Sequence, residues 1–397
     1  MGTVALSPRV NLEQSKKQAK ELLVSFKAGD PETLDRIRWN HPRFRGLADS
    51  EIRIRKFVLA DAQLVIARLH YFDSWPKLLR HIETVARNDP RVMRFETAAD
   101  AIISGDIATL SGLLHEHPDL IHQRSTRGHH APLLHYITAN GVENYRQLSP
   151  RNAVEVGMLL LDSGAEVDAT SEAYGGGSTA LGLVVTSTPP RRAGVQLPLM
   201  NLLLERGAAI DGVTPGASSI MAALANNCPE AAAALAERGA RVDDIIAAAG
   251  IGRLDLVRHL ASDATQEQRD TALVMAARYG HHDVVEHLLD AGVDIAASDG
   301  MTALHVAAGH GHLGLVDLLI ERGAPLEKTN VFGGTVLAST LWFAYHHEPL
   351  VSERIDYPAV IDKLIDAGAK VDVYPGMREH IGEVYRRAGR RPAWRRD

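Results

Sequence analysis

The chain has 397 residues, enough for two or three globular domains or for one continuous array of repeats. Its formal net charge of -6 and pI near 6.3 argue against a general nucleic-acid-binding protein, which usually carries a basic face. The single cysteine, Cys228, excludes a disulfide framework and a cysteine metal site. The N-terminus lacks a secretory apolar core, and no apolar run reaches membrane-spanning length. We therefore expect a cytoplasmic protein with no membrane partner and no nucleic-acid partner.

Residues 1–90 are predicted to form a helical N-terminal domain. Residues 12–28 are amphipathic, and Pro31 suits the first turn of the next helix because its missing N–H needs no partner there. A second helix pair is predicted at roughly 50–71 and 74–85. We interpret the domain as two degenerate copies of the helix pairs that follow.

Helix-turn-helix units recur along residues 91–373, about eight in all. The two clearest units, 268–298 and 299–331, repeat at a spacing of 31 residues. Glycine ends their second helices at Gly292 and Gly323, because it enters the left-handed conformation that a helix C-terminus needs. Each helix alone would expose one apolar stripe to water, so the units must stack to bury it. The sequence predicts an all-α solenoid.

The phrase Thr302-Ala303-Leu304-His305 resembles the Thr-Pro-Leu-His motif of the ankyrin-repeat family and differs from it only at Ala303. Residues 59–83 resemble a helical leader found ahead of ankyrin repeats in bacterial proteins. The resemblance implies stacked helix pairs with a concave recognition face. It also implies that the chain is mostly a protein-recognition scaffold, since that is what ankyrin arrays generally are.

Three units carry an insertion at the same position, between their two helices. Such insertions are either tolerated lengthening of a solvated loop or a wall or lid beside the groove. They fall at residues 142–152, 186–194 and 344–358. Residues 374–397 are predicted to form a capping helix, near 377–388, and a basic tail that is either a solvated end or a contact for an acidic partner or RNA.

The 19 histidines do not show the spacing of a metal site, so we expect no metal and no cofactor. His305 falls at the family position where the resemblance implies that imidazole bridges backbone groups of adjacent repeats. His281 and His312 fall in the Gly-His turns between helices, for which we also expect structural roles.

Three polar residues of the first repeats stand where the family carries apolar residues or alanine. Asp100, His135 and Tyr136 are therefore expected to be buried and hydrogen-bonded, with the alternative that they form a small shielded network. If the chain is an enzyme, these three residues are the candidate catalytic residues, because acid–base catalysis favours an acid, an imidazole and a phenol in one pocket.

The repeat register also indicates which positions face the groove. The strip is small and polar in its first half and gathers aromatic and charged side chains in its second half, where Trp, Tyr and Arg are typical of binding hot spots. An alternative is that Trp342 and Phe343 only cover the last repeat under the C-terminal cap. The candidate binding residues are Asp270, Arg278, Tyr279, Met301, His310, Trp342 and Phe343, with Tyr345, His346 and His347 in the adjoining insertion.

Two hypotheses follow. The first is a binding module that holds a protein or peptide partner on its concave face. The second is an enzyme or small-molecule binder whose pocket is built by the insertions and the buried polar residues of the first repeats. An open groove favours the first and a closed pocket under the insertions favours the second. The sequence leaves the oligomeric state open.

Overall fold

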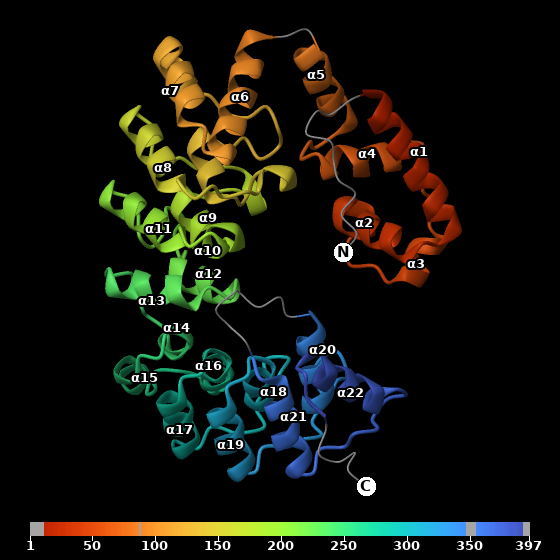
Figure 1. Cartoon of the computed structure of the whole chain (residues 1–397), viewed down its shortest axis with the longest axis vertical. Coiled ribbons are helices and arrows are strands. Elements are labelled where there is room, and N and C mark those ends of the chain that lie inside the picture. Colours follow the sequence, from red (N-terminus) through yellow and green to blue (C-terminus); the bar gives the residue numbers. More distant parts are fainter. Residues whose placement is uncertain (1–11, 87–88, 347–354, 392–397) are drawn as a thin grey trace. The chain divides into compact units, whose positions relative to one another are not determined.

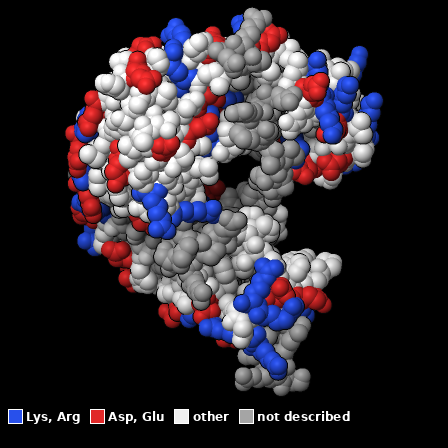
Figure 2. Space-filling view, turned by 45° about the horizontal axis from the view of Figure 1, so that its top comes forward, with Lys and Arg blue, Asp and Glu red and all other residues white. Residues whose placement is uncertain are grey.

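The computed structural model describes residues 12–86, 89–346 and 355–391 (Figure 1). It divides into two units, residues 1–217 and 218–397, and each is described by itself. Acidic and basic side chains are interspersed over much of the face shown in Figure 2, as the small net charge indicates. In the described residues, no helix is long and apolar enough to cross a membrane.

The first unit begins with five α-helices that share a core of their own. Helix α1 packs along α4, and residues such as Leu22, Ile37, Phe44 and Val65 fill the space between the helices. The bounds are α1 Leu12–Ala28, α2 Pro31–Asn40, the 3₁₀ helix η1 Pro42–Phe44, α3 Asp49–Ile54, α4 Leu59–Leu69 and α5 Trp75–Ala86.

The second predicted helix pair is broken in its first member. The expected single helix over roughly 50–71 is two helices, α3 and α4, because Arg55 and Val58 between them are extended. The Asp61 carboxylate accepts from the Val58 amide at 2.8 Å and thereby starts α4 anew.

The rest of the first unit consists of stacked repeats. Helices α6, η3 and α9 follow one another on one side of the stack, and α7, α8 and α11 follow one another on the other side (Figure 1). The bounds are α6 Pro90–Ser104, α7 Ile107–Glu116, η2 Pro118–His122, η3 Leu133–Thr138, η4 Asn144–Arg146, α8 Ala153–Asp162, η5 Ala173–Gly175, α9 Ala180–Val184, α10 Thr188–Arg192 and α11 Gln196–Glu205.

The second unit repeats the helix-turn-helix pattern with greater regularity. Helices α14, α16, α18 and α20 pack in sequence and form the inner row of one continuous apolar core. The bounds are α12 Ser219–Ala225, α13 Pro229–Glu237, α14 Ile245–Gly250, α15 Leu254–Leu260, α16 Gln266–Tyr279, α17 His282–Asp290, α18 Ala303–Gly309, α19 Leu313–Glu321, α20 Val336–His346, α21 Tyr357–Asp366 and α22 Met377–Arg387.

Histidine side chains join neighbouring repeats in the second unit. His305 Nε2 donates to the Gly334 carbonyl at 3.2 Å, His281 Nε2 to Gly250 at 3.0 Å and His312 Nε2 to Arg278 at 2.8 Å. Each bond reaches a backbone carbonyl about one repeat away, so these imidazoles hold adjacent repeats together.

The insertions have local structure of their own. In residues 142–152, Val142 and Glu143 are buried and the segment contains η4, so this insertion is not a solvated loop. Residues 186–194 form the short helix α10. In residues 344–358, the first three extend α20, and 347–354 lie outside the described residues, as does the end of the basic tail, 392–397. Helix α22 buries Met377, Ile381 and Tyr385 against the last repeat.

Candidate functional site

A cavity of about 520 Å³ opens on the inner side of the last repeat in the second unit. We call it the apolar pocket, because none of the described side chains that line it is charged. Trp342 and Phe332 remain 57% and 84% exposed, so the pocket lies open at the surface. It is lined by Met301, Asn330, Phe332, Gly334, Ala338, Ser339, Trp342 and Phe343.

One wall of the pocket is the tip of the loop between α19 and α20. Asn330 shapes this tip, because its Oδ1 accepts from the amides of Phe332 at 2.9 Å and Gly334 at 3.0 Å. Its Nδ2 donates to Ser339 Oγ on α20 at 2.9 Å. The Val331 amide donates to the Gly300 carbonyl of the preceding loop at 3.0 Å. Phe332 is thus held out over the pocket by a hydrogen-bonded loop.

The other wall is a row of aromatic rings on α20. Trp342 lies edge-on to Phe343 at 5.5 Å between ring centroids and stacks on His346 at 4.6 Å. The Phe343 ring in turn lies 5.5 Å, between centroids, from the ring of His310 on the neighbouring repeat. Trp342 and Phe343 both line the open cavity.

The predicted binding residues fall into two groups. Met301, Trp342 and Phe343 line the apolar pocket, and His310 and His346 lie against its aromatic rings. The other described ones are not among the residues that line it.

Three of these other residues are engaged within the fold. Tyr279 donates its hydroxyl proton to the Leu224 carbonyl, and Asp270 accepts from Gln266. Tyr345 donates to the His380 carbonyl of α22 at 3.2 Å and lies under the Arg387 guanidinium. Arg278 is partly buried, and its carbonyl accepts from His312. His347 lies outside the described residues.

Sequence reasoning missed Asn330 and Phe332. Both lie in the loop tip, outside the positions that the register projects onto the groove. A signal was present in the sequence, since Val331 and Phe332 are large apolar residues between Asn330 and a Gly-Gly pair, in a turn where small or polar residues are usual.

The first repeats contain a buried network of charges. The Arg127 guanidinium lies 2.9 Å from the Glu96 carboxylate and also pairs with Glu143. Arg146 contacts the same Glu96 oxygen at 2.9 Å and reaches Asp100 at 2.7 Å. The side chains of Arg127, Glu143 and Arg146 are each only 2% exposed. Because Glu143 and Arg146 belong to the insertion 142–152, ion pairs fasten that insertion to α6.

The opposite charges of this network keep one another ionised despite burial. Burial alone raises the pKa of Glu143, but the Arg127 guanidinium and its neighbours outweigh burial and lower it to about 2. Burial likewise opposes the charge of Arg127, and the carboxylates of Glu143 and Glu96 overcome it and raise the pKa of Arg127. Burial raises the pKa of the Tyr136 phenol well above its usual value. The ions are therefore paired and the phenol stays neutral.

Asp100, His135 and Tyr136 do not meet in one pocket. Asp100 is 62% exposed, so the expectation that it is buried is wrong; it lies at the edge of α6, where Arg146 reaches it. Tyr136 donates to Glu143 at 3.3 Å. His135 Nε2 donates instead to the Ala169 carbonyl at 2.8 Å, and burial lowers the pKa of His135 to about 4. Arg146 thus links the acid and the phenol, since its guanidinium also lies 5.8 Å from the centre of the Tyr136 ring, whereas the imidazole has a partner of its own.

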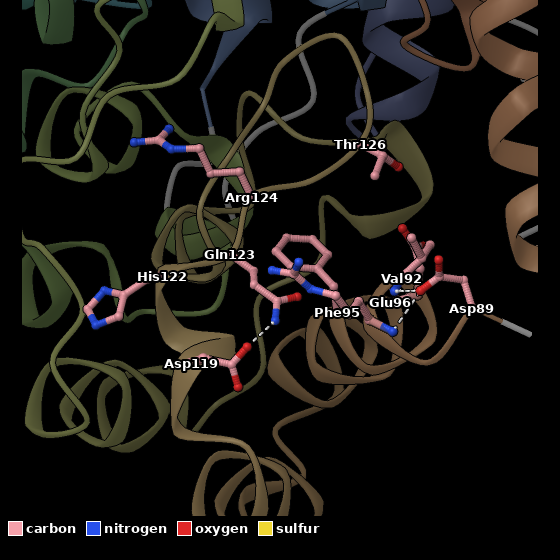
Figure 3. Close-up of a pocket in the computed structure, with 10 residues that line it drawn as sticks. Asp89, Val92, Phe95, Glu96, Asp119, His122, Gln123, Arg124 and Thr126 are labelled. Atoms are coloured by element: carbon pink, nitrogen blue, oxygen red, sulfur yellow. Dashed lines mark hydrogen bonds between the residues drawn. The ribbon is translucent and has the colours of Figure 1, made fainter.

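A second cavity, of about 680 Å³, lies between α6 and the segment after η2 (Figure 3). Phe95 and Glu96 face it from α6, and Gln123 faces it from the opposite segment. Its polar groups already serve the fold: Gln123 donates to Asp119 at 3.0 Å, and Asp89 accepts from the Arg91 amide at 2.9 Å as the cap of α6. These bonds leave few polar groups directed at a ligand. Among the described residues, no cluster of His, Cys, Asp and Glu could hold a metal ion.

The stacked helix pairs and their inter-repeat histidines define an all-α repeat protein. Residues 245–330, which span α14 to α19, match the family model of ankyrin repeats (3 copies). The chain therefore contains ankyrin repeats at residues 245–330, and the predicted all-α ankyrin fold is confirmed. No curated protein matches the chain. Ankyrin repeats generally mediate protein–protein interaction.

Proposed function

We propose that this chain is a binding scaffold that holds a protein or peptide partner through the apolar pocket of its second unit. The observation that carries the proposal is the exposure of Trp342 and Phe332 over a cavity of about 520 Å³. Exposed aromatic residues around a concavity are typical of interaction sites, because monomeric proteins rarely leave such groups in water.

The chemistry of the pocket indicates the part of the partner that enters it. Its lining consists of aromatic rings, one thioether and small residues, with Asn330 and Ser339 as the polar members. These two side chains already bond to each other at 2.9 Å. A large apolar side chain, such as Leu, Met, Phe or Trp, would gain contact with three rings and leave no polar group unpaired.

The open surface favours a polypeptide over a small molecule. A drug-sized ligand needs most of its own surface buried, whereas a pocket with Phe332 and Trp342 on its rim takes one anchoring side chain while the rest of the partner lies outside. The inner helices α16, α18 and α20 pack side by side next to the pocket, and the rest of the partner chain would lie across them.

Selection of peptides from a random library on the immobilised full chain tests this function. We expect selected peptides to share a large apolar anchor and to lose at least about tenfold in affinity when that anchor is replaced by alanine, as for a buried hot-spot residue. The variant Trp342→Ser with Phe332→Ser removes both rim rings and should bind none of them.

A matched control removes aromatic area elsewhere. Trp39 is exposed on α2 of the first unit, so Trp39→Ser should leave the affinity of the selected peptides unchanged. Peptides without a common apolar anchor, or peptides that bind the pocket variant as tightly as the wild type, would overturn the proposal.

A further inference from the structure

A cleft of about 250 Å³ in the first unit has a different chemistry from the apolar pocket. Its walls come from the turn after α4, the loop before η3 and the loop that carries η5. We call it the tyrosine cleft, and the residues that define it are Tyr71, Asp73, Gly128, His129, Glu172 and Tyr174.

The two tyrosine rings are held in place in the free protein. Tyr71 donates its hydroxyl proton to Asn144 Oδ1 at 2.6 Å, and Tyr174 donates to Asn140 Oδ1 at 2.5 Å. Tyr174 is 76% exposed and would otherwise rotate freely. Both hydroxyl protons are already donated within the protein. A ligand would therefore contact chiefly the ring faces, which carry the negative side of the aromatic quadrupole.

The backbone also fixes these rings at an energetic cost. Tyr71 and Tyr174 both adopt left-handed backbone angles, with φ of 63° and 55°, which side-chain-bearing residues rarely adopt. The Tyr71 carbonyl accepts from the Gly128 amide, and a Cβ on Gly128 would lie 2.9 Å from that carbonyl and 3.0 Å from Asp73 Oδ1. Only glycine permits the loop to approach the turn this closely.

The charges at the cleft favour a cation. Asp73 and Glu172 contribute carboxylates to its lining, and Arg68, the one arginine among the described lining residues, donates its Nη1 to the Asn40 carbonyl at 3.4 Å. Lys77 pairs with Asp73, but both side chains are more than half exposed, and such pairs exchange readily for another cation.

His129 does not oppose a positive ligand. Its Nδ1 accepts from the Ala131 amide at 3.0 Å, and its Nε2 faces Glu143 at 3.5 Å. Both ring nitrogens therefore face groups inside the protein. The imidazole lies edge-on to the Tyr71 ring, with 5.9 Å between centroids, and forms part of the aromatic wall.

From this juxtaposition of two anchored tyrosine rings with two carboxylates around one cleft, we propose that the tyrosine cleft binds a cationic side chain, lysine or arginine, of a partner polypeptide. The rings supply cation–π attraction and the carboxylates supply charge pairing. The site belongs to the first unit and does not depend on the function proposed for the apolar pocket.

The test uses blocked amino acids as probes with the isotope-labelled full chain. N-acetyl-lysine methylamide and its arginine counterpart are titrated to tens of millimolar while the backbone amide resonances of Gly128 and Gly141 are followed by NMR. Gly141 also lines the cleft. We expect saturable shifts with both cationic probes. The norleucine probe matches the length of lysine without its charge, and the glutamate probe reverses the charge; neither should saturate.

Variants separate charge from ring contact. Asp73→Asn with Glu172→Gln keeps the shape of both side chains and should weaken lysine binding at least about fivefold, since it leaves only the cation–π contribution. Tyr174→Asn keeps a residue that tolerates the left-handed backbone and removes one ring, with a similar loss expected. Phe332→Ser, in the second unit, is the control and should bind the lysine probe as the wild type does.

Three results would overturn the inference. The first is the absence of saturable shifts with the lysine and arginine probes. The second is norleucine or glutamate binding as tightly as lysine, which would make the cleft an apolar or anion site. The third is full lysine affinity in the doubly neutralised variant. None of these outcomes bears on the peptide selection at the apolar pocket, so the two proposals fail separately.

Discussion

The guanidinium of Arg146, in the insertion 142–152, lies 2.9 Å from the carboxylate of Glu96 on α6, the inner helix of the preceding repeat. This contact turns a lengthened loop into part of the core. It also places a buried cation between Glu96 and Glu143, so that neither carboxylate is left alone in an apolar environment.

Replacing this arginine tests how far the network supports the fold. Arg146→Met keeps the length of the side chain and leaves two buried carboxylates with one guanidinium fewer. We expect the first unit to lose about 3–5 kcal/mol of unfolding free energy, as when one partner of a buried ion pair is removed. Urea unfolding, with hydrogen exchange of α6 as the local readout, measures the loss.

The control is an arginine in an exposed ion pair. Arg253 pairs with Asp255 at 2.6 Å, and both side chains are at least half exposed. Arg253→Met should therefore change stability by less than about 1 kcal/mol. Similar losses for the two variants would show that the buried network does not stabilise the first repeats.

The first unit should lose stability in acid. Burial lowers the pKa of His70, His81 and His135 from 6.5 to about 4. Between these two pH values the three histidines bind protons in the unfolded chain but not in the folded chain, so stability falls as the pH drops from 6.5 to 4. Glu143, whose pKa lies near 2 in the fold against 4.5 outside it, extends the loss to lower pH.

Urea unfolding across this pH range measures the effect. Each histidine contributes about 1.4 kcal/mol for every unit by which its pKa is lowered. His81→Gln removes one titrating group and keeps a hydrogen-bonding side chain for Thr126, so the slope of stability against pH should become shallower in that variant. An unchanged slope would contradict the assignment.

Two glycines of one repeat should respond in opposite ways to alanine. A Cβ on Gly309 would lie 2.6 Å from ring atoms of Phe343, so Gly309→Ala must displace a wall of the apolar pocket. We expect a loss of about 1–3 kcal/mol and weaker binding of peptides selected on the pocket. At Gly314 on α19 no heavy atom lies within 4 Å of the added Cβ.

Gly314→Ala should therefore stabilise the second unit by up to about 1 kcal/mol, because alanine favours a helix over glycine. Thermal unfolding and peptide titration of the two variants, side by side, check both statements. Equal affinity of the Gly309→Ala variant and the wild type would show that Phe343 does not shape the binding site.

His312 links two repeats, whereas His282, the residue after the sequence counterpart His281, is not expected to do so. His312→Ala removes the donor to the Arg278 carbonyl and leaves space against Gly280, at a cost of about 1–3 kcal/mol. His282 is exposed at the first residue of α17, so His282→Ala should change stability by less than about 0.5 kcal/mol. Urea unfolding of the second unit distinguishes them.

Local patterns were sufficient to predict the repeats. These patterns are the glycine stops, the apolar stripes and the Thr302–His305 motif. Each reflects a local conformational preference, and together they recur often enough to define a repeat register. That register placed Met301, Trp342 and Phe343 on one face, and these residues line the apolar pocket. It could not place Phe332, because a loop tip has no period to project.

The register also failed for side chains that pack across repeats. Tyr279 and Tyr345 were expected to face a partner, yet their hydroxyls bond to the Leu224 and His380 carbonyls. The helix register predicts the face on which a side chain lies. It does not predict a hydrogen-bond partner that belongs to another element. For the same reason Asp100, His135 and Tyr136 were grouped by their unusual identities, yet only Asp100 and Tyr136 share a neighbour, Arg146, and His135 bonds to the Ala169 carbonyl.

By itself, the sequence determined that this chain is an all-α array of ankyrin repeats, because helix periodicity, glycine stops and motif spacing are local properties that survive without knowledge of contacts. Tertiary structure alone decided what the irregular segments do. It paired Arg146 with Glu96, placed Phe332 and Trp342 around one pocket and placed Tyr71, Asp73 and Glu172 around one cleft. These contacts join residues far apart in the chain or in loops without a period, and such pairs form only when the whole unit is folded.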